Sequence, residues 1–391
     1  MVWSKGPVDD RKKMIEMYER EGLSKSELAR RLGVTRQCVH KWLGRYAEEG
    51  VDGLADHSRA PLYRPRATDP EVVRALVDLK HRHGYGPDKL VVLLEKERGV
   101  TIPASTARDI LNRHGLTGRR GRRRPCWSPT EVPQIIIPGP GHTMSADHKG
   151  KFRLGNGRYC YPLTLSDPAA RWVHAIQALA STQGFLAKPV FERVFAEYGL
   201  PEQILTDNGP PFSGPSVGGL SELSAWWIRL AIRPIRIERG RPQQNGVHER
   251  MHRTLKEATI VPPASTMQGQ QRRFNAFRHE FNHVRPHQAL GQRPPAEVMQ
   301  PYRRSLPAKI PPIEYSAYFD VRRVRSNGEI KWQGLTPHVT TILIGEPVGL
   351  RRRDDGTWEL HYGAVHLADW SEDDEKFVPP QVRAVKATGE P

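Results

Sequence analysis

Between residues 143 and 237 the chain alternates short β-type segments with amphipathic helical segments. Alternating apolar residues bounded by turn residues predict strands, and apolar residues three or four apart predict helices. The expected strands are 143–147, 158–165, 171–178, 203–206 and 232–237, and the expected helices are 182–198, 219–230 and 243–259. Consecutive strands followed by alternating strands and helices predict an α/β domain with a mixed sheet, which we place at 139–305.

The next segment, 313–371, is rich in short β-type stretches separated by glycines. The expected strands are 318–325, 329–332, 340–344, 347–353, 358–362 and 365–370. A small β-barrel pairs the edges of many short strands, so we expect one here. The end of the chain, 372–391, begins acidic and is expected to be a flexible tail.

Residues 1–60 predict a helix-turn-helix DNA-binding domain. Ser24 and Glu27 form a capping box at the start of a short helix, and Gly33 permits a left-handed turn. Thr35 then caps a second helix. An ordinary helical hairpin with charged outer faces is the alternative. In the helix-turn-helix interpretation, the exposed residues of the second helix that contact DNA are Arg36, Gln37, His40 and Lys41.

A second helical, helix-turn-helix-like DNA-binding module is expected at 66–117, with helices over 70–83, 88–98 and 104–114. An arginine- and proline-rich linker, 118–138, follows it. Its arginines either form a solvated, mutually repelling tether or follow DNA phosphates as an arm in a minor groove. We favour phosphate contact, and the residues concerned are Arg119, Arg120, Arg122, Arg123 and Arg124.

The chain has a net charge of +17 and a pI near 10.0, and the excess of Lys and Arg lies before residue 313. This charge indicates a polyanionic partner, because each phosphate neutralised by a cation releases condensed counterions. The three cysteines are scattered, which favours a reducing compartment. The chain shows no signal peptide and no run of about 18 apolar residues that could span a membrane. We therefore expect a cytoplasmic protein.

Two carboxylates of the α/β domain stand at the ends of expected strands. Asp147 ends the strand 143–147, and Asp207 follows the strand 203–206. Side chains at strand ends project into the crevice at a sheet edge, where ligands bind. Asn208 and Gly209 turn the chain directly after Asp207 and expose its side chain.

A third carboxylate, Glu249, lies on the expected helix 243–259, with Arg253 and Lys256 on the same face. Three carboxylates from three elements can hold two Mg²⁺ ions through oxygen ligands. Two such ions activate the attacking oxygen and stabilise the leaving oxygen of an in-line phosphoryl displacement. The competing interpretation makes Asp207 a turn residue and Glu249 a helix ion-pair partner.

Histidines at helical spacing offer a different metal site. His248 and His252 are four residues apart, a spacing that can bind zinc. Further ligands are not evident from the sequence. We therefore expect the pair to be exposed on a basic helix, solvated or near phosphate.

Three motifs together resemble those of bacterial insertion-sequence transposases of the retroviral-integrase superfamily. They are TDNGPPF at 206–212, GRPQQNGVHERMHRTLK at 240–256 and FNHVRPHQALG at 281–291. The resemblance is strong over about 140–300, and the helix-turn-helix front end fits it. It implies an RNase H-like catalytic core with a DDE triad that depends on Mg²⁺ or Mn²⁺. By position, the triad that also binds the metals maps to Asp147, Asp207 and Glu249.

The chain departs from the family pattern at two places. The family usually has Trp three residues before its first Asp, and Met144 stands there instead. Asp167 is the nearby competitor for Asp147, although it resembles an Asp that does not bind metal in relatives. The separation of Asp207 from Glu249 is also longer than in many relatives. The additional residues lie in the glycine-rich stretch 214–219, where insertions are tolerated.

The third motif has two open interpretations. It either packs a final helix against the sheet, or Arg285 or His287 contacts the backbone of a transposon end. In the segment after 313, basic residues could still form a local DNA-binding face, and protein–protein contact is equally plausible there. These residues are Arg322, Arg323, Arg325 and the run 351–353.

The resemblance implies a transposase that binds the terminal inverted repeats of its element, cleaves the ends and joins them to target DNA. Arg253 and Lys256 would hold phosphates near the metals. Because two ends are processed together, we expect a homo-oligomer, at least a dimer on DNA, at the bacterial nucleoid. The alternatives are a non-catalytic DNA-binding regulator and an RNase H-like structure-specific nuclease.

Overall fold

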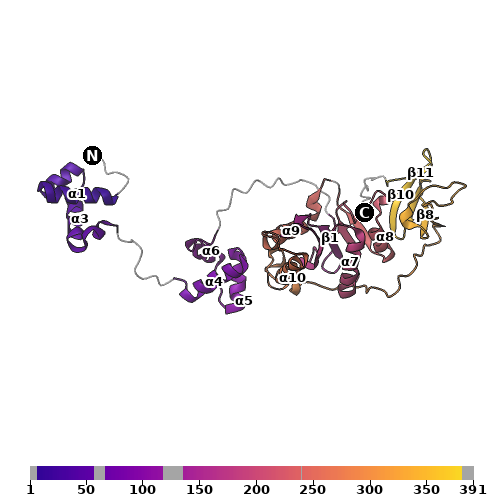
Figure 1. Ribbon diagram of the computed structural model, residues 1–391, viewed down its shortest axis with the longest axis horizontal. Coiled ribbons are helices and arrows are strands. Elements are labelled where there is room, and N and C mark those ends of the chain that lie inside the picture. The colour runs from indigo at the N-terminus through magenta and orange to yellow at the C-terminus, as the bar shows by residue number, and fades with distance from the viewer. Residues whose placement is uncertain (1–6, 57–66, 118–134, 239, 381–391) are drawn as a thin grey trace, which may run out of the picture. The chain divides into compact units, whose positions relative to one another are not determined.

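The computed structural model describes residues 7–56, 67–117, 135–238 and 240–380, which form two compact units, 1–70 and 71–391 (Figure 1). The predicted linker arginines between 119 and 124 lie outside the described residues. We describe each unit by itself. Among the described helices, none combines the length and apolar character needed to cross a membrane.

The N-terminal unit contains α1 (Pro7–Glu21), α2 (Lys25–Leu32) and α3 (Arg36–Glu49), followed by a 3₁₀ turn at Gly50–Leu54. The Ser24 hydroxyl accepts the amide N–H of Glu27, and the Thr35 hydroxyl accepts that of Cys38. Gly33 has a φ of 69° and ends α2 in the left-handed conformation that glycine adopts without strain. The predicted caps at Ser24 and Thr35 and the turn at Gly33 are confirmed, whereas the Glu27 carboxylate of the expected capping box pairs with Arg30. The helices enclose a small core of Met14, Leu28, Val39, Trp42 and Leu54.

The second unit begins with three helices, α4 (Pro70–His83), α5 (Pro87–Arg98) and α6 (Ala104–Arg113). Their facing leucines form a separate core that includes Leu76, Leu90 and Leu94. The helices also contact the α/β domain. The Tyr85 hydroxyl donates to Oε1 of Glu280 at 2.7 Å, and His83 Nδ1 lies 2.8 Å from the same oxygen.

The α/β domain is built on a mixed six-stranded sheet, as predicted. Its strands are β1 (Thr143–His148), β2 (Phe152–Arg153), β3 (Tyr159–Asp167), β4 (Trp172–Leu179), β5 (Gln203–Thr206) and β6 (Arg233–Arg236). The order is β2-β3-β1-β5-β6, and β4 pairs with β3. The strand β1 is antiparallel to β3 and parallel to β5, and β5 is parallel to β6. The parallel pairing brings the ends of β1 and β5 to the same sheet edge.

Helices cover both faces of this sheet (Figure 1). On one face α7 (Gly184–Tyr198) and α8 (Glu222–Arg229) form a core with β1 and β3 that includes Phe191 and Trp227. On the other face α9 (Gly246–Thr259) and α10 (Met267–His283) pack on β3 and β4 through residues such as Leu255 and Phe274. The helix α9 is therefore fixed against the middle of the sheet, which decides where its side chains point.

The C-terminal region is an open antiparallel sheet, so the predicted β-barrel is wrong. Its strands are β7 (Asp320–Arg323), β8 (Pro347–Arg352), β9 (Trp358–Tyr362), β10 (Val365–Ser371) and β11 (Lys376–Val378). They pair in the order β11-β10-β9-β8-β7, and the two edges do not pair with each other. Closure fails because the expected strand 340–344 contains a 3₁₀ turn, and 329–332 makes only isolated bridges. The stretch 376–378, expected in the tail, is the fifth strand.

The glycine-rich stretch 214–219 connects this sheet to the α/β domain. Gly218 has a φ of 63°, and a Cβ atom there would lie 2.9 Å from the side chain of Leu367 in β10. The Arg236 guanidinium on β6 donates to the carbonyl of Gly219 at 2.8 Å and also to that of Gly218. The stretch in which an insertion was expected thus packs the C-terminal sheet against the core.

Candidate active site

Asp147 and Asp207 meet at one edge of the sheet. The strands β1 and β5 are parallel, with Ser145 paired to Leu205. Continuing this register by two residues places Asp147 level with Asp207. Both side chains are partly buried, and that of Asp147 is 18% exposed. The geometry expected from two strand-end carboxylates is therefore present.

The turn after β5 holds Asp207 in place. The amide N–H of Gly209 donates to Oδ1 of Asp207 at 3.1 Å, and the Asn208 side chain donates to the carbonyl of Ile237 at 2.7 Å. A Cβ atom at Gly209 would lie 3.1 Å from Oδ2 of Asp207, so a side chain there would press on this carboxylate. One carboxylate oxygen is held by the backbone, and the other remains available as a ligand.

Glu249 lies on α9, on the face of the helix that is not packed on the sheet, and is near enough to Asp147 for its charge to contribute to the raised pKa of that residue. Glu249, Arg253 and Lys256 are all exposed, whereas Leu255 and Thr259 on the opposite face are buried. The helix thus presents a carboxylate and two cations on one surface, as its sequence spacing predicted.

The three carboxylates interact electrostatically. The pKa of Asp147 is raised to about 7, first by burial and then by the negative charge of Asp207, with a further contribution from Glu249. Like charges held together in a partly buried site favour proton uptake or a bound cation. Oxygen ligands from three carboxylates suit a hard divalent cation such as Mg²⁺ or Mn²⁺, so the donor set fits that group.

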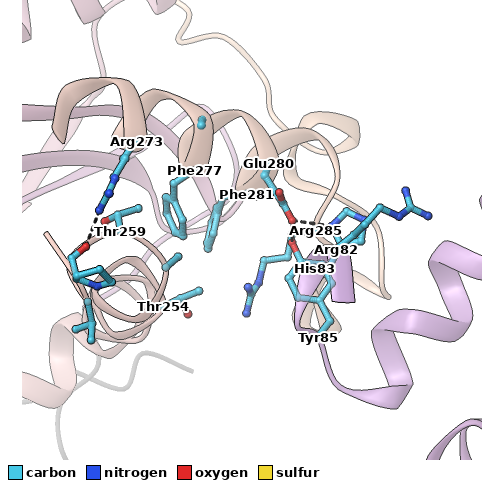
Figure 2. Close-up of a pocket in the computed structure, with 14 residues that line it drawn as sticks. Arg82, His83, Tyr85, Thr254, Thr259, Arg273, Phe277, Glu280, Phe281 and Arg285 are labelled. Carbon is cyan, nitrogen blue, oxygen red and sulfur yellow. Dashed lines mark hydrogen bonds and ion pairs between the residues drawn. The ribbon is translucent and has the colours of Figure 1, made fainter. Parts of the chain in front are cut away.

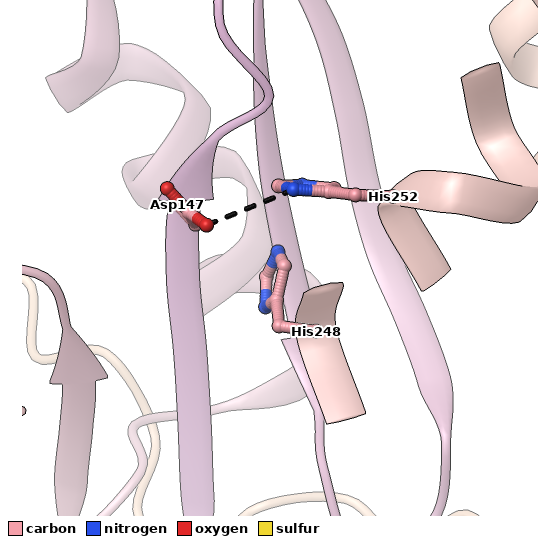
Figure 3. Close-up of side chains that lie close together, drawn as sticks. All are labelled: Asp147, His248 and His252. Carbon is pink, nitrogen blue, oxygen red and sulfur yellow. Dashed lines mark ion pairs between the residues drawn. The ribbon is translucent and has the colours of Figure 1, made fainter. Parts of the chain in front are cut away.

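The expectation that His248 and His252 are exposed is wrong, because α9 turns both toward the sheet. Both residues are buried, and their rings lie edge to face 4.6 Å apart. The Thr164 hydroxyl on β3 lies 2.6 Å from Nε2 of His248 and 2.7 Å from Nε2 of His252. Nδ1 of His252 faces Oδ2 of Asp147 at 3.7 Å (Figure 3).

These contacts leave His248 without a free nitrogen for a metal. Its Nδ1 lies 2.9 Å from the Ser145 hydroxyl, which is also within 3.0 Å of Oδ1 of Asn245. Burial lowers the pKa of His248 to about 3 and lowers that of His252 as well, so both rings are neutral. Although the ligand atoms of Asp147, His248 and His252 lie within 4.8 Å of one another, hydrogen bonding satisfies His248. The pair is better described as a support beneath Asp147.

The i, i+4 spacing of His248 and His252 was the one sequence signal for the polar network beneath Asp147. Nothing in the sequence marked the other residues of this network. Ser145 and Thr164 are ordinary strand residues, and Asn245 lies just before α9. Only the packing of α9 on β1 and β3 joins them into one buried polar network.

Asp167 occupies a different environment from Asp147. Its Oδ1 accepts the amide N–H groups of Ala169 and Ala170, and its Oδ2 accepts that of Gly141. The side chain is fully buried and holds the turn between β3 and β4. Met144, in place of the family's Trp, is also fully buried and belongs to the sheet core.

The residues expected to contact DNA lie in three places. The four residues Arg36, Gln37, His40 and Lys41 are all exposed on α3, in the N-terminal unit. Arg253 and Lys256 are exposed on α9. The third motif has a packing role at Phe281, which is buried and contacts the ring of His287 edge to face at 4.7 Å.

Comparison with known proteins agrees with this domain order. Residues 230–295 match the integrase core domain family, and residues 6–55 and 38–111 match two families of homeodomain-like domains. The chain is 25% identical to a 31.7 kDa protein of insertion element IS407 from Burkholderia multivorans, over 75% of the chain and 97% of that protein. It is 31% identical to the Gag-Pol polyprotein of avian reticuloendotheliosis virus, over 50% of the chain but only 16% of the polyprotein.

Solved structures similar to the chain include retroviral integrases. The HTLV-2 integrase catalytic core in complex with magnesium is 14% identical, with a TM-score of 0.33, over 41% of this chain and 98% of that one. The simian T-cell lymphotropic virus intasome in complex with a PP2A regulatory subunit is 16% identical, with a TM-score of 0.36, over 74% of this chain and 97% of that one. By its sequence matches, the chain carries an integrase core domain after N-terminal homeodomain-like domains.

Proposed function

We propose that this chain, which joins homeodomain-like domains to an integrase core domain, is a DDE-type transposase. It would bind the terminal inverted repeats of an insertion sequence, cleave the element ends and join them to target DNA. The observation that carries the proposal is the grouping of Asp147, Asp207 and Glu249: burial, then the charge of Asp207 and to a smaller extent that of Glu249, raise the pKa of Asp147 to about 7.

Asp147, Asp207 and Glu249 would be the carboxylates that hold two Mg²⁺ or Mn²⁺ ions. When bound, the ions polarise the phosphodiester and stabilise the charge on the attacking and leaving oxygens. Arg253 and Lys256 are exposed on the Glu249 face of α9 and would hold neighbouring phosphates of the DNA.

Two displacements at phosphorus account for cutting and joining. In the first, a water oxygen bonds to the phosphorus at the element end, the P–O3′ bond breaks, and a free 3′-hydroxyl remains. In the second, the oxygen of that hydroxyl bonds to a target phosphorus, the target P–O3′ bond breaks, and the number of phosphodiester bonds is unchanged. Each step releases one proton from the attacking hydroxyl and returns one to the leaving oxygen.

DNA recognition would fall to the helical domains. The exposed face of α3, with Arg36, Gln37, His40 and Lys41, is suited to a major groove. The linker arginines 119–124, outside the described residues, would follow phosphates. Since both ends of an element are processed together, the active form would be a homo-oligomer on DNA, at the bacterial nucleoid.

The deciding experiment uses the purified full chain with a labelled DNA duplex that carries an element end, in Mg²⁺ or Mn²⁺. We expect cleavage at the end and, from pre-cut ends, a joined product. The Glu249→Gln variant should bind the same DNA but lose both reactions by at least about 100-fold, since it removes a metal ligand. Undiminished joining by this variant would reject the enzymatic proposal. Cleavage without joining would indicate a nuclease, and binding without either reaction a regulator.

A further inference from the structure

A second hollow of the α/β domain lies on the side of α9 opposite the carboxylate site. It is a cavity of about 260 Å³ bounded by α5, the turn between β3 and β4, α9 and the segment after α10. Val247, Met251 and Thr254 line it from α9, and Phe281 forms an apolar wall. These positions differ from Glu249, Arg253 and Lys256, so the cavity uses another face of the same helix.

Four cations from four separate elements line this cavity. They are Lys89 of α5, Arg171 of the β3–β4 turn, Arg250 of α9 and Arg285 after α10. Within the ranges that the structure describes, no carboxylate lies within ion-pair distance of any of them. Asp167 also lines the cavity, but its oxygens accept three backbone N–H groups.

Two polar atoms in this cavity lack the partners that buried groups normally have. Nε of Arg171 and Nε2 of His287 are buried without a hydrogen bond among the described residues. Arg171 also has a φ of 58°, a left-handed conformation that costs a residue with a Cβ atom about 1 kcal/mol. Of the two atoms, Nε of Arg171 is a donor, and a buried donor without a partner costs free energy, so its retention points to a ligand that accepts from it.

The cations repel one another. Burial and the positive charge of Arg285 lower the pKa of Lys89 to about 8. Burial, followed by the charges of Lys89, Arg285 and Arg171, lowers the pKa of His287 to about 3. An anion in the cavity would remove this repulsion and keep Lys89 protonated.

We propose that this cavity binds a backbone phosphate of the DNA strand held by the integrase core domain. Arginine forks and a lysine match a phosphate that needs several donors, and the cavity borders the helix that carries Glu249. Arg285 also lines a neighbouring groove with Tyr85 and Glu280, where its guanidinium lies 4.9 Å from the Tyr85 ring (Figure 2). The inference rests on the proposed function, because that function supplies the DNA.

The first test is the salt dependence of binding to an element-end duplex. Removing one phosphate contact should reduce the slope of log K against log salt by about 0.9. We expect this reduction in the double variant Lys89→Met/Arg285→Gln, and no change in Arg303→Gln, an exposed arginine outside the cavity. An unchanged slope in a folded double variant would overturn the inference.

The second test needs no variant. Lys89 is methylated with formaldehyde and a reductant in the unmodified protein near pH 8, and its modification is quantified by mass spectrometry with Lys188 of α7 as the exposed control. End DNA should protect Lys89 at least about 10-fold and leave Lys188 unchanged, whereas inorganic phosphate at the same phosphate concentration should not protect. Equal protection by inorganic phosphate would show that the ligand is a free anion and not DNA. If DNA did not protect Lys89, the proposed site would be rejected.

These outcomes separate the two proposals. Protection of Lys89 by DNA in a protein that neither cleaves nor joins would keep the phosphate site and reject the transposase. Cleavage and joining by a protein in which DNA does not protect Lys89 would keep the transposase and reject the phosphate site.

Discussion

Nδ1 of His252 lies 3.7 Å from Oδ2 of Asp147, while Nε2 of the same ring lies 2.7 Å from the hydroxyl of Thr164. That hydroxyl donates to the backbone carbonyl of Asp147 at 2.8 Å. The carboxylate and its backbone are thus both tied to one buried network. Because burial and electrostatic repulsion from His248 lower the pKa of His252, the ring lies beside the Asp147 carboxylate as a neutral group.

Removing this support should weaken metal binding without unfolding the domain. We expect His252→Gln and Thr164→Val to lower Mn²⁺ affinity by about 10- to 100-fold, the usual effect of losing a group that orients a metal ligand. Calorimetric titration of Mn²⁺ measures this. His279→Gln, on the exposed side of α10, is the control and should bind like the unmodified protein. Unchanged affinity in both test variants would show that the network does not act on Asp147.

Asp147 and Asp167 should respond differently to the same substitution. Asp147→Asn should abolish metal-dependent cleavage without destabilising the fold, and at neutral pH in the absence of metal it should raise thermal stability, because it removes a partly buried charge. Asp167→Asn should destabilise the fold by about 1–3 kcal/mol, because that carboxylate accepts three buried backbone N–H groups. Cleavage assays and thermal melts of both variants decide the matter. Loss of chemistry in a stable Asp167→Asn protein would reverse the assignment.

The raised pKa of Asp147 predicts a pH-dependent stability in the absence of metal. Its folded value is about 7, against an ordinary value of 3.8, so between these pH values the folded state binds more protons than the unfolded chain. The stability contribution of Asp147 therefore falls as pH rises through this window, by about 1.4 kcal/mol per pKa unit.

Buried neutral histidines such as His248 act in the opposite sense, since their folded pKa values are depressed. The readout is therefore the difference in unfolding free energy between the unmodified protein and Asp147→Asn, measured in urea with chelator present. That difference should fall between about pH 4 and pH 7 and recover when Mg²⁺ is added. A flat difference would contradict the burial and charge assigned to Asp147.

Gly209 should be intolerant of a side chain. Its Cβ position lies 3.1 Å from Oδ2 of Asp207, so Gly209→Ala should displace that carboxylate and lower metal affinity by at least about 10-fold. Gly246→Ala, at the start of α9, meets no neighbour within 4 Å and serves as the control. The same Mn²⁺ titration measures both. An unchanged Mn²⁺ affinity of Gly209→Ala would show that the turn accommodates a side chain without moving the Asp207 carboxylate.

Gly218→Ala should loosen the C-terminal sheet. The substitution adds left-handed strain of about 1–2 kcal/mol and a clash with Leu367 at 2.9 Å, worth about 1–3 kcal/mol more. Gly334→Ala has a comparable φ but meets nothing within 4 Å, so it isolates the strain alone. Urea unfolding followed by tryptophan fluorescence compares the two. Equal losses of unfolding free energy in the two variants would show that the clash with Leu367 does not contribute to the destabilisation.

Local features were predictable because neighbouring residues determine them. The caps at Ser24 and Thr35 and the left-handed turn at Gly33 depend on groups within a few residues, and the structure confirms all three. The strand ends at Asp147 and Asp207 follow from alternation and turn residues for the same reason. That these two carboxylates together with Glu249 perform catalysis stays a prediction.

The wrong predictions concern features that depend on contacts between residues far apart in the sequence. No closed barrel forms, because closure requires the first and last strands to pair. The segments 329–332 and 340–344, which were expected to be strands, do not join the sheet as strands. The prediction that His248 and His252 are exposed was wrong, because the spacing of residues along a helix defines its faces but does not show which face packs against another segment. Periodicity and turn chemistry determined the helices and strands of the α/β domain and the strand-end positions of Asp147 and Asp207. Packing of α9 on the sheet alone decided which side chains are buried beneath Asp147, because burial depends on contacts between segments about 100 residues apart in the chain.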